Sequence, residues 1–362
     1  MGGDRAVRHF GGFDTLRIFA AMAVVLTHSF ELTGHATDRP FAHVGRYPIA
    51  PGEVGVWIFF ATSGFLVARS FARVQRGIPF AWNRFARIWP ALITLILLSV
   101  FVLGPLMTTL TLHQYFSSTV TWHYLVRNLI MFKGPTFALP GVFANQPAKA
   151  INGSLWTLPY ELWAYVGVLL LGVTGLLKRR YIPIGLAIVA IVTFRFDTYS
   201  HQIHFNYSAF AMSTRQGAPL AAFFLIGVVA AGIHDFDLRR LAWPASALLA
   251  LSLLVREPVL FIVAMAALTL GLGTTDTRFS ARLRTLGDPS YGMYIFCFPL
   301  QQTLYHAGIH TSWVMFAASA PLSVAIGYAS WHIVESPALR RLKYRRKRLW
   351  STDVRPAPAA AN

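Results

Sequence analysis

The sequence predicts an all-α protein: a polytopic membrane bundle of about ten transmembrane helices with both termini in the cytoplasm. Of its 362 residues, 55% are hydrophobic and only 13% are charged, whereas soluble domains carry roughly 25% charged residues. Ten segments meet or approach the roughly 20 apolar residues that a membrane-crossing helix needs. Lys and Arg gather in every second loop between these segments, as expected for a chain that crosses the membrane repeatedly and keeps its positive loops on one side.

The predicted spans follow one another with short connections. In order, they are 16–33, 54–72, 88–107, 154–177, 182–196, 218–233, 241–255, 259–274, 290–307 and 313–334. The seventh and eighth are separated only by Arg256, Glu257 and Pro258, which indicates either a tight hairpin or one span counted twice. The first span is too long for the apolar core of a cleaved signal peptide, and no small-residue cleavage site follows it.

The net charge is +18, from 32 Lys and Arg against 14 Asp and Glu. In a soluble chain this excess would suggest nucleic-acid binding, but here the cations follow the loops. Loops that retain Lys and Arg stay cytoplasmic, so the charge sets topology and no nucleic-acid partner is expected. The basic run Arg340–Arg348 is expected to contact anionic membrane lipids. Residues 349–362 are predicted to form a short, disordered cytoplasmic tail.

No metal site is expected. The chain has a single cysteine, Cys297, and no HExxH sequence. Two close histidine pairs, 201 with 204 and 306 with 310, lie in or beside predicted polar loops and are not expected to bind a metal.

The first predicted span contains two ionisable residues, Arg17 and His28. Such residues inside a membrane are costly and usually functional. At about 100° and 1.5 Å per residue, they share one helix face and lie about 16 Å apart along it. Taken by itself, Arg17 is explained by a side chain that extends to the inner headgroups, and His28 by a hydrogen-bonded packing role. Because the two share one helix face, together they predict a polar track across the membrane.

A carboxylate, Glu161, lies about two turns inside the fourth predicted span, at a depth comparable to that of His28. We expect it to pair with the imidazole and to stabilise its charged form. Pairing with an arginine is the structural alternative.

Two further features face the cytoplasmic half. Ser63 and Gly64 lie in the middle of the second span, where small residues permit close helix packing or the approach of a thin ligand. Arg84 and Arg87 precede the third span on one helical face, and positive-inside topology alone accounts for them. With Arg17, they also suit a cytosolic ligand that carries several phosphates.

These residues together resemble the acyltransferase-3 family of multi-pass membrane acyltransferases. The resemblance covers nearly the whole chain and rests on an ordered set of motifs. They are Phe13-Asp14-Thr15-Leu16-Arg17 with His28, the segment 59–66, Arg84-Phe85-Ala86-Arg87, Gly153-Ser154-Leu155-Trp156 with Glu161, the segment 290–294 and Val334-Glu335-Ser336-Pro337. One departure is Cys297-Phe298-Pro299, where many members have His-Trp-Pro.

The resemblance implies an integral membrane acyltransferase domain over residues 1–348, in the inner membrane of a bacterial cell. It implies transfer of an acetyl or other acyl group from cytosolic acyl-CoA, a co-substrate rather than a bound cofactor, to a hydroxyl. The acceptor would be a cell-surface or exported polysaccharide or its lipid-linked precursor, and other polysaccharide-biosynthesis proteins are candidate partners. His28 is the expected general base, supported by Glu161, while Arg17, Arg84, Arg87 and Ser63 are expected to bind the donor.

Three alternatives stay open from the sequence. The same arginines suit a transporter or flippase for an anionic lipid or sugar. Within the enzyme class, the acceptor could be a small molecule such as a macrolide, or the donor could carry a succinyl group. Ser63 and Cys297 are the candidate nucleophiles if the acyl group passes through the protein.

Overall fold

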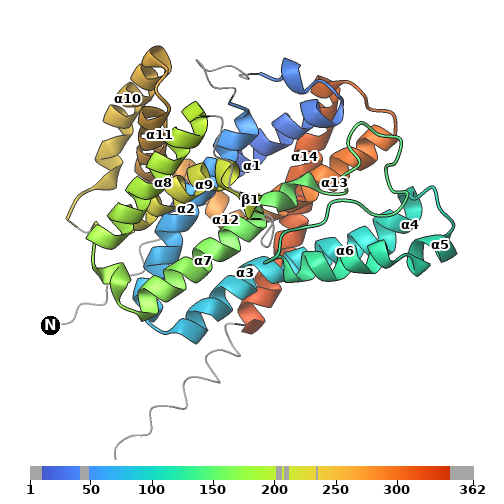
Figure 1. Ribbon diagram of the computed structural model, residues 1–362, viewed down its shortest axis with the longest axis horizontal. Coiled ribbons are helices and arrows are strands. Elements are labelled where there is room, and N and C mark those ends of the chain that lie inside the picture. Colours follow the sequence, from blue (N-terminus) through green and yellow to red (C-terminus); the bar gives the residue numbers. More distant parts are fainter. Residues whose placement is uncertain (1–9, 41–48, 201–205, 208–211, 234, 343–362) are drawn as a thin grey trace, which may run out of the picture.

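The computed structural model describes residues 10–40, 49–200, 206–207, 212–233 and 235–342 (Figure 1). Its helices are α1 (Gly11–Leu32), α2 (Pro51–Val74), α3 (Gly77–Leu98), α4 (Gly104–Met107), α5 (Leu112–Ser117), α6 (Thr119–Ile130), α7 (Leu158–Val173), α8 (Tyr181–Ser200), α9 (Thr214–Ala231), α10 (Ala242–Val255), α11 (Pro258–Gly273), α12 (Arg278–Leu286), α13 (Ser290–His306) and α14 (Ser312–Ser330). Two short antiparallel strands, β1 (Asn206–Tyr207) and β2 (Met212–Ser213), are the exception to the predicted all-helical fold.

Each of the ten predicted spans falls on a helix. Among the described residues, seven helices are long and apolar enough to cross a membrane, or eight if α11 and α12, which meet at 79°, form one span. The remaining three predicted spans fall on shorter apolar helices: the apolar part of α8, Tyr181–Phe196, is under 18 residues long, α11 has 16 residues and α13 has 17. Helices of that length span roughly 24–26 Å, less than the roughly 30 Å hydrocarbon core. A count of ten spans therefore stays a prediction.

The two termini, including the predicted tail 349–362, lie outside the described residues, so their cytoplasmic placement also stays a prediction. The loop between the seventh and eighth predicted spans is a tight hairpin. α10 ends at Val255, Arg256 takes the left-handed conformation with φ 58°, and α11 starts at Pro258. Proline suits the first turn of a helix because its missing N–H has no partner there.

The third span differs from its predicted start. α3 begins at Gly77, eleven residues before the predicted start at Ile88, so Arg84 and Arg87 lie inside the helix rather than in a loop. The first turns of α3 carry cations on one face. Their low hydropathy predicts a loop between two spans, although the backbone there is helical. The helix loosens into a π-helical turn at Ser99–Leu103, just before Pro105, whose ring clashes with the carbonyl four residues earlier.

The centre of the bundle is formed by α1, α2 and α9, which pack through small residues. A Cβ atom at Gly64 of α2 would lie 1.9 Å from the carbonyl oxygen of Phe224 in α9. A Cβ at Gly227 of α9 would lie 2.2 Å from the carbonyl oxygen of Ala61. The two backbones approach this closely because neither glycine has a side chain, as in other close helix pairs within membranes.

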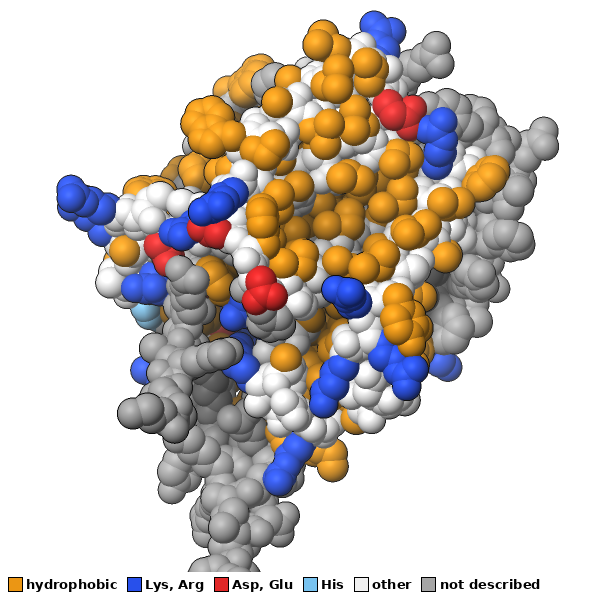
Figure 2. Space-filling model, turned by 90° about the vertical axis from the view of Figure 1, so that its left-hand side faces the viewer, with side chains coloured by type: hydrophobic (Ala, Val, Ile, Leu, Met, Phe, Trp, Pro, Cys, Tyr) orange, Lys and Arg blue, Asp and Glu red, His pale blue; other side chains and the backbone are white. Residues whose placement is uncertain are grey.

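Helices α8, α10 and α11 form one side of the molecule, and α4, α5 and α6 lie at the opposite side (Figure 1). Figure 2 shows the first of these sides, where apolar side chains form a broad surface and Lys and Arg gather at its margins. The exposed apolar residues of α8 and α10 include Ile188, Val189, Trp243 and Leu254. An apolar surface of this extent is unusual on a soluble monomer and fits contact with lipid.

Candidate active site

A partly polar cavity of about 310 Å³ lies between α1, α2, α3, α7 and α13. Its arginine-rich end lies where α1 begins and α2 ends. A second cavity of about 480 Å³ adjoins it there, and the two share Ser70, Arg73, Arg84 and Arg87. The opposite end of the first cavity is lined by Thr157, Glu161 and Tyr294. The cavity thus joins a cationic mouth to an aromatic and hydroxyl-lined interior.

Arg17 and Arg87 line this cavity, but both already hold carboxylates. Arg17 Nη1 donates to Asp288 Oδ2 at 2.7 Å, and Arg87 Nη2 donates to the same oxygen at 2.5 Å. Arg87 Nη1 also donates to Glu335 Oε2 at 3.1 Å, and the Glu335 side chain is only 2% exposed. Two guanidinium groups and two carboxylates therefore form a largely buried network. It joins α1, α3, the loop before α13 and the π-helical turn Trp331–Glu335 that follows α14.

Asp288 is the centre of that network. Burial by itself would raise the pKa of its carboxyl, but Arg17, Arg87 and two hydrogen bonds from Ser290 outweigh burial. They hold the pKa of Asp288 well below its usual range. The carboxylate therefore stays ionised at neutral pH.

Arg84 differs from the other two arginines. Its guanidinium lies over the rings of Phe80 and Tyr165, 5.9 and 5.6 Å from their centres. It forms no ion pair with the described residues, and its buried Nε atom has no hydrogen-bond partner there. A buried donor without a partner carries a desolvation cost. Tyr165 is hydrogen-bonded to Arg84. Within the part of the chain that the structure describes, Arg17 and Arg87 form ion pairs with carboxylates and Arg84 does not.

Ser63 and Glu161 meet inside the cavity. Ser63 Oγ lies 3.5 Å from Glu161 Oε1 and 3.3 Å from the hydroxyl of Tyr165, which itself donates to Glu161. Ser63 is thus beside the cavity while its neighbour Gly64 packs against α9. The structure brings these two predicted site residues together through Tyr165.

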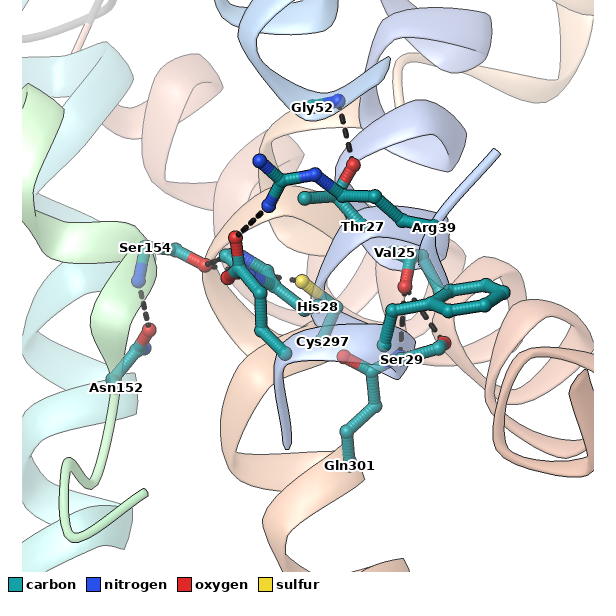
Figure 3. Close-up of polar contacts among 12 residues, drawn as sticks. Val25, Thr27, His28, Ser29, Arg39, Gly52, Asn152, Ser154, Cys297 and Gln301 are labelled. Carbon is teal, nitrogen blue, oxygen red and sulfur yellow. Dashed lines mark hydrogen bonds and ion pairs between the residues drawn. The ribbon is translucent and has the colours of Figure 1, made fainter. Parts of the chain in front are cut away.

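The predicted pairing of Glu161 with His28 is wrong. His28 Nδ1 lies 3.0 Å from Oε2 of Glu31, one turn along the same helix, and Arg39 Nη1 donates to the other carboxylate oxygen at 3.2 Å. Residues three apart on a helix are neighbours on its surface. The carboxylate of Glu31 therefore pairs with the His28 imidazole in place of the carboxylate of Glu161. Figure 3 shows His28 and Arg39 in this group.

The other imidazole nitrogen of His28 faces Ser154. The distance from Nε2 to Ser154 Oγ is 3.3 Å, and the ring of Phe298 packs edge-on against the imidazole with centres 5.0 Å apart. The fully buried Cys297 also lies near Ser154, with 3.9 Å between Sγ and Oγ. Figure 3 shows Ser154, His28 and Cys297 meeting where α1, α13 and the turn before α7 come together.

The turn that carries Ser154 is anchored on both sides. Asn152 accepts a hydrogen bond from the Ser154 N–H at 3.0 Å and donates to the carbonyl of Ile295 at 2.7 Å. It thereby caps the 3₁₀-helix Gly153–Thr157 and holds it against α13. A Cβ at Gly153 would lie 2.5 Å from the Phe298 ring, so only glycine fits between the turn and this ring.

His28 is not among the described residues that line the cavity. A hydrogen-bonded pair closes the intervening space: Thr157 Oγ1 lies 2.7 Å from the hydroxyl of Tyr294, which donates to the carbonyl oxygen of Ser154 at 2.9 Å. The predicted continuous track from Arg17 to His28 is therefore interrupted by Tyr294. His28 and Ser154 lie immediately beyond it.

Sequence reasoning missed Glu31, Ser154, Tyr294 and Asp288 as site residues. The spacing of Glu31 from His28 was a usable signal, because residues three apart share a helix face. For Asp288 no such signal exists, since it lies 271 positions from Arg17 in the chain.

Comparison with known proteins gives two kinds of match. The family model described as "Acyltransferase domain" matches residues 10–332. The chain is similar to an "O-acetyl transferase" of Shigella phage Sf6, with 28% identity over 353 residues, 91% of this chain and 96% of the relative. It is similar to "Nodulation protein 10" of Rhizobium leguminosarum bv. viciae, with 28% identity over 92% of this chain and 94% of the relative. No solved structure matches.

Proposed function

This chain belongs to the acyltransferase family whose domain model it matches, and from that premise we propose that it moves an acetyl group from cytosolic acyl-CoA to a glycan hydroxyl. It is an acyltransferase, and its apolar helices make it a multi-pass membrane protein. The proposed acceptor is a cell-surface or exported polysaccharide or its lipid-linked precursor. The name of the phage relative, "O-acetyl transferase", supports transfer of acetyl to oxygen.

The proposal rests on the cavity. Arginines line one end of it, and His28 with its partners Glu31 and Ser154, called the His28 group, lies beyond the opposite end. Coenzyme A has phosphates at one end and a thin thioester arm at the other. The arm suits a cavity of about 310 Å³, and the nucleotide suits the adjoining cavity at the mouth. Arg84 and Arg73 line both cavities and would bind the phosphates. Arg17 and Arg87 contribute a framework that is already neutralised by carboxylates.

In this proposal His28 is the general base for the acceptor hydroxyl. A neutral imidazole that donates from Nδ1 to Glu31 leaves Nε2 free to accept a proton. A base positioned in this way contributes typically 10²–10⁴-fold to the rate. Glu161, which does not contact His28, is proposed to line the path of the thioester arm together with Ser63.

The test uses purified protein with acetyl-CoA and polysaccharide or lipid-linked acceptor from the cell envelope. Release of free coenzyme A together with acetylated acceptor is the expected result. His28→Ala is expected to lower turnover roughly 10²–10⁴-fold, while the control His123→Ala, an exposed histidine on α6, is expected to keep it. Normal turnover in the His28 variant would contradict the assigned base.

The other candidate functions are tested by the same preparation. Membership of an acyltransferase family favours an enzyme over a transporter. Succinyl-CoA in place of acetyl-CoA, and a macrolide in place of the glycan, test the other donor and acceptor. Nuclear magnetic resonance of the surface polysaccharide, with and without the gene, checks the acceptor in the cell through its O-acetyl signals.

We also propose that the protein lies in the inner membrane of a bacterium with both termini in the cytoplasm. The excess of Lys and Arg in alternate loops supports this orientation. A C-terminal fusion to green fluorescent protein is expected to fluoresce, and a fusion to alkaline phosphatase at the same site is expected to be inactive. Active phosphatase would place that end outside.

A further inference from the structure

Ser154, His28 and Glu31 have the arrangement of a nucleophile, a base and an orienting carboxylate. Ser154 Oγ lies 3.3 Å from His28 Nε2, and His28 Nδ1 lies 3.0 Å from Glu31 Oε2. An activated nucleophile is recognised by this geometry, with distances of about 2.6–3.2 Å that are often looser without substrate. The order of the three residues in the sequence carries no weight, because such triads occur in several chain orders.

We propose that Ser154 is a covalent acyl carrier, so that the acyl group passes through an ester on its hydroxyl. The inference rests on the proposed acyl-CoA donor. Ser154 Oγ attacks the thioester carbon while His28 Nε2 takes the hydroxyl proton. The carbon–sulfur bond breaks, and the leaving thiolate receives that proton from His28.

The second half returns the enzyme to its starting state. The acceptor hydroxyl gives its proton to His28 and attacks the ester carbon, and the bond to Ser154 Oγ breaks. His28 then returns the proton to that oxygen. The sum is acyl-CoA plus acceptor giving free coenzyme A plus acylated acceptor, with no other reactant.

The position of Ser154 favours it over the other two nucleophiles. Ser63 lies within the cavity, but its described contacts are Glu161 and Tyr165 and include no histidine. Cys297 Sγ is buried and donates to the carbonyl oxygen of Tyr294. Its other described contact is with Ser154, and it has no hydrogen bond with His28 among the described residues. Of the three, Ser154 alone contacts the proposed base.

Ser154 also lies at the boundary between the cavity and the His28 group. Thr157 and Tyr294 line the end of the cavity, and the Tyr294 hydroxyl donates to the carbonyl oxygen of Ser154. Ser154 itself is only 1% exposed. A carrier in this position receives the acyl group from one side of Tyr294 and presents it on the other, so donor and acceptor need not meet.

The test is isotope exchange between acetyl-CoA and labelled free coenzyme A, because this half-reaction needs no acceptor. Wild-type protein is expected to exchange label, and Ser154→Ala is expected to fall to the level of His28→Ala. The control Ser323→Ala, a buried serine of α14 whose Oγ has no described partner, is expected to exchange normally. Thermal unfolding of each variant checks that it is folded.

A second readout separates a chemical role from a structural one. Mass spectrometry of acid-quenched wild-type protein is expected to find the acetyl group on Ser154. Ser154→Cys is expected to carry it as a thioester, which neutral hydroxylamine cleaves, whereas the wild-type ester survives the same treatment. Thioester formation at position 154 would not follow from a role in packing alone.

Transfer to an acceptor without exchange, exchange in Ser154→Ala, or acetyl on His28 or Cys297 would overturn the acyl-serine while leaving the proposed function intact. Protein that neither exchanges nor transfers acetyl from acetyl-CoA would contradict both proposals.

Discussion

Nδ1 of His28 lies 3.0 Å from Oε2 of Glu31, one turn further along α1, and Arg39 holds the second carboxylate oxygen. This contact fixes which imidazole nitrogen carries the proton. It leaves Nε2 directed at Ser154, the position from which a proton would be taken. The orientation of His28 is therefore set within α1 and its following loop, independently of the cavity.

We expect Glu31→Gln to lower kcat roughly 10²–10⁴-fold, the scale of a general base, because an amide does not stabilise the imidazolium. KM for acetyl-CoA should change little, since Glu31 is not among the described residues of the cavity wall. The control is the double variant with His28→Ala. It should be no slower than His28→Ala alone, because residues that act as a unit are not additive. If the losses in kcat of the two single variants added in the double variant, Glu31 would act independently of His28.

Glu161→Gln is expected to behave differently, because its carboxylate faces Ser63 and Tyr165 in the cavity. We expect KM for acetyl-CoA to rise about tenfold, equivalent to about 1.4 kcal/mol of binding free energy, with a smaller change in kcat. Steady-state kinetics with varied donor distinguish the two variants. A fall in kcat equal to that of Glu31→Gln would restore Glu161 to a role in proton transfer.

The packing of α2 on α9 gives a prediction about stability. Gly64→Ala would place a Cβ atom 1.9 Å from the carbonyl oxygen of Phe224, so the helices must separate. We expect a loss of about 1–3 kcal/mol or more in the free energy of unfolding, measured by thermal unfolding in detergent. The matched control is Gly167→Ala in α7, where a Cβ meets nothing within 4 Å. Equal stability of the two variants would contradict the described contact between α2 and α9.

The positions of the helices could be predicted from the sequence because a membrane span needs many consecutive apolar residues. The start of α3 could not, since the turns around Arg84 are cationic yet helical. The interior of the cavity was predicted in part: Arg17, Ser63, Arg84, Arg87 and Glu161 do line one space.

The pairing inside the site was harder to predict, because depth in the membrane does not determine which side chains face each other. His28 and Glu161 were placed at similar depth, yet Tyr294 lies at the cavity end and Glu31 holds the imidazole. Ser154 depends on the turn anchored by Asn152 to Ile295, a contact across 143 positions. Only the folded chain reveals that contact.

Asp288→Asn is expected to destabilise the protein, because two guanidinium groups lose their shared carboxylate. Breaking a fully buried ion pair costs about 3–5 kcal/mol, and a smaller loss is expected here because the side chains of Arg17 and Asp288 are 19% and 15% exposed. The folded-state pKa of Asp288 is depressed, so its contribution is complete above the ordinary value near 4 and is lost as pH falls below it. The difference in Tm between wild type and variant should therefore be constant from about pH 7 to 5 and narrow below about pH 4. A difference that widens in acid would contradict the ionised state.

Arg84 and Arg87 offer a matched test, since they lie three residues apart on α3 and both line the cavity. Arg84 forms no ion pair with the described residues, and its described contacts are the rings of Phe80 and Tyr165 and the Tyr165 hydroxyl. Arg84→Gln should therefore lower Tm less than Arg87→Gln does and raise KM for acetyl-CoA at least about tenfold. Arg87→Gln leaves the buried Glu335 carboxylate without its cation. It should lower Tm clearly, because an unpaired buried charge is costly. KM for acetyl-CoA and Tm, measured for both variants, check that Arg84 binds the donor while Arg87 stabilises the fold. If Arg84→Gln lost stability without a change in KM, its guanidinium would be structural and the phosphates would need another partner.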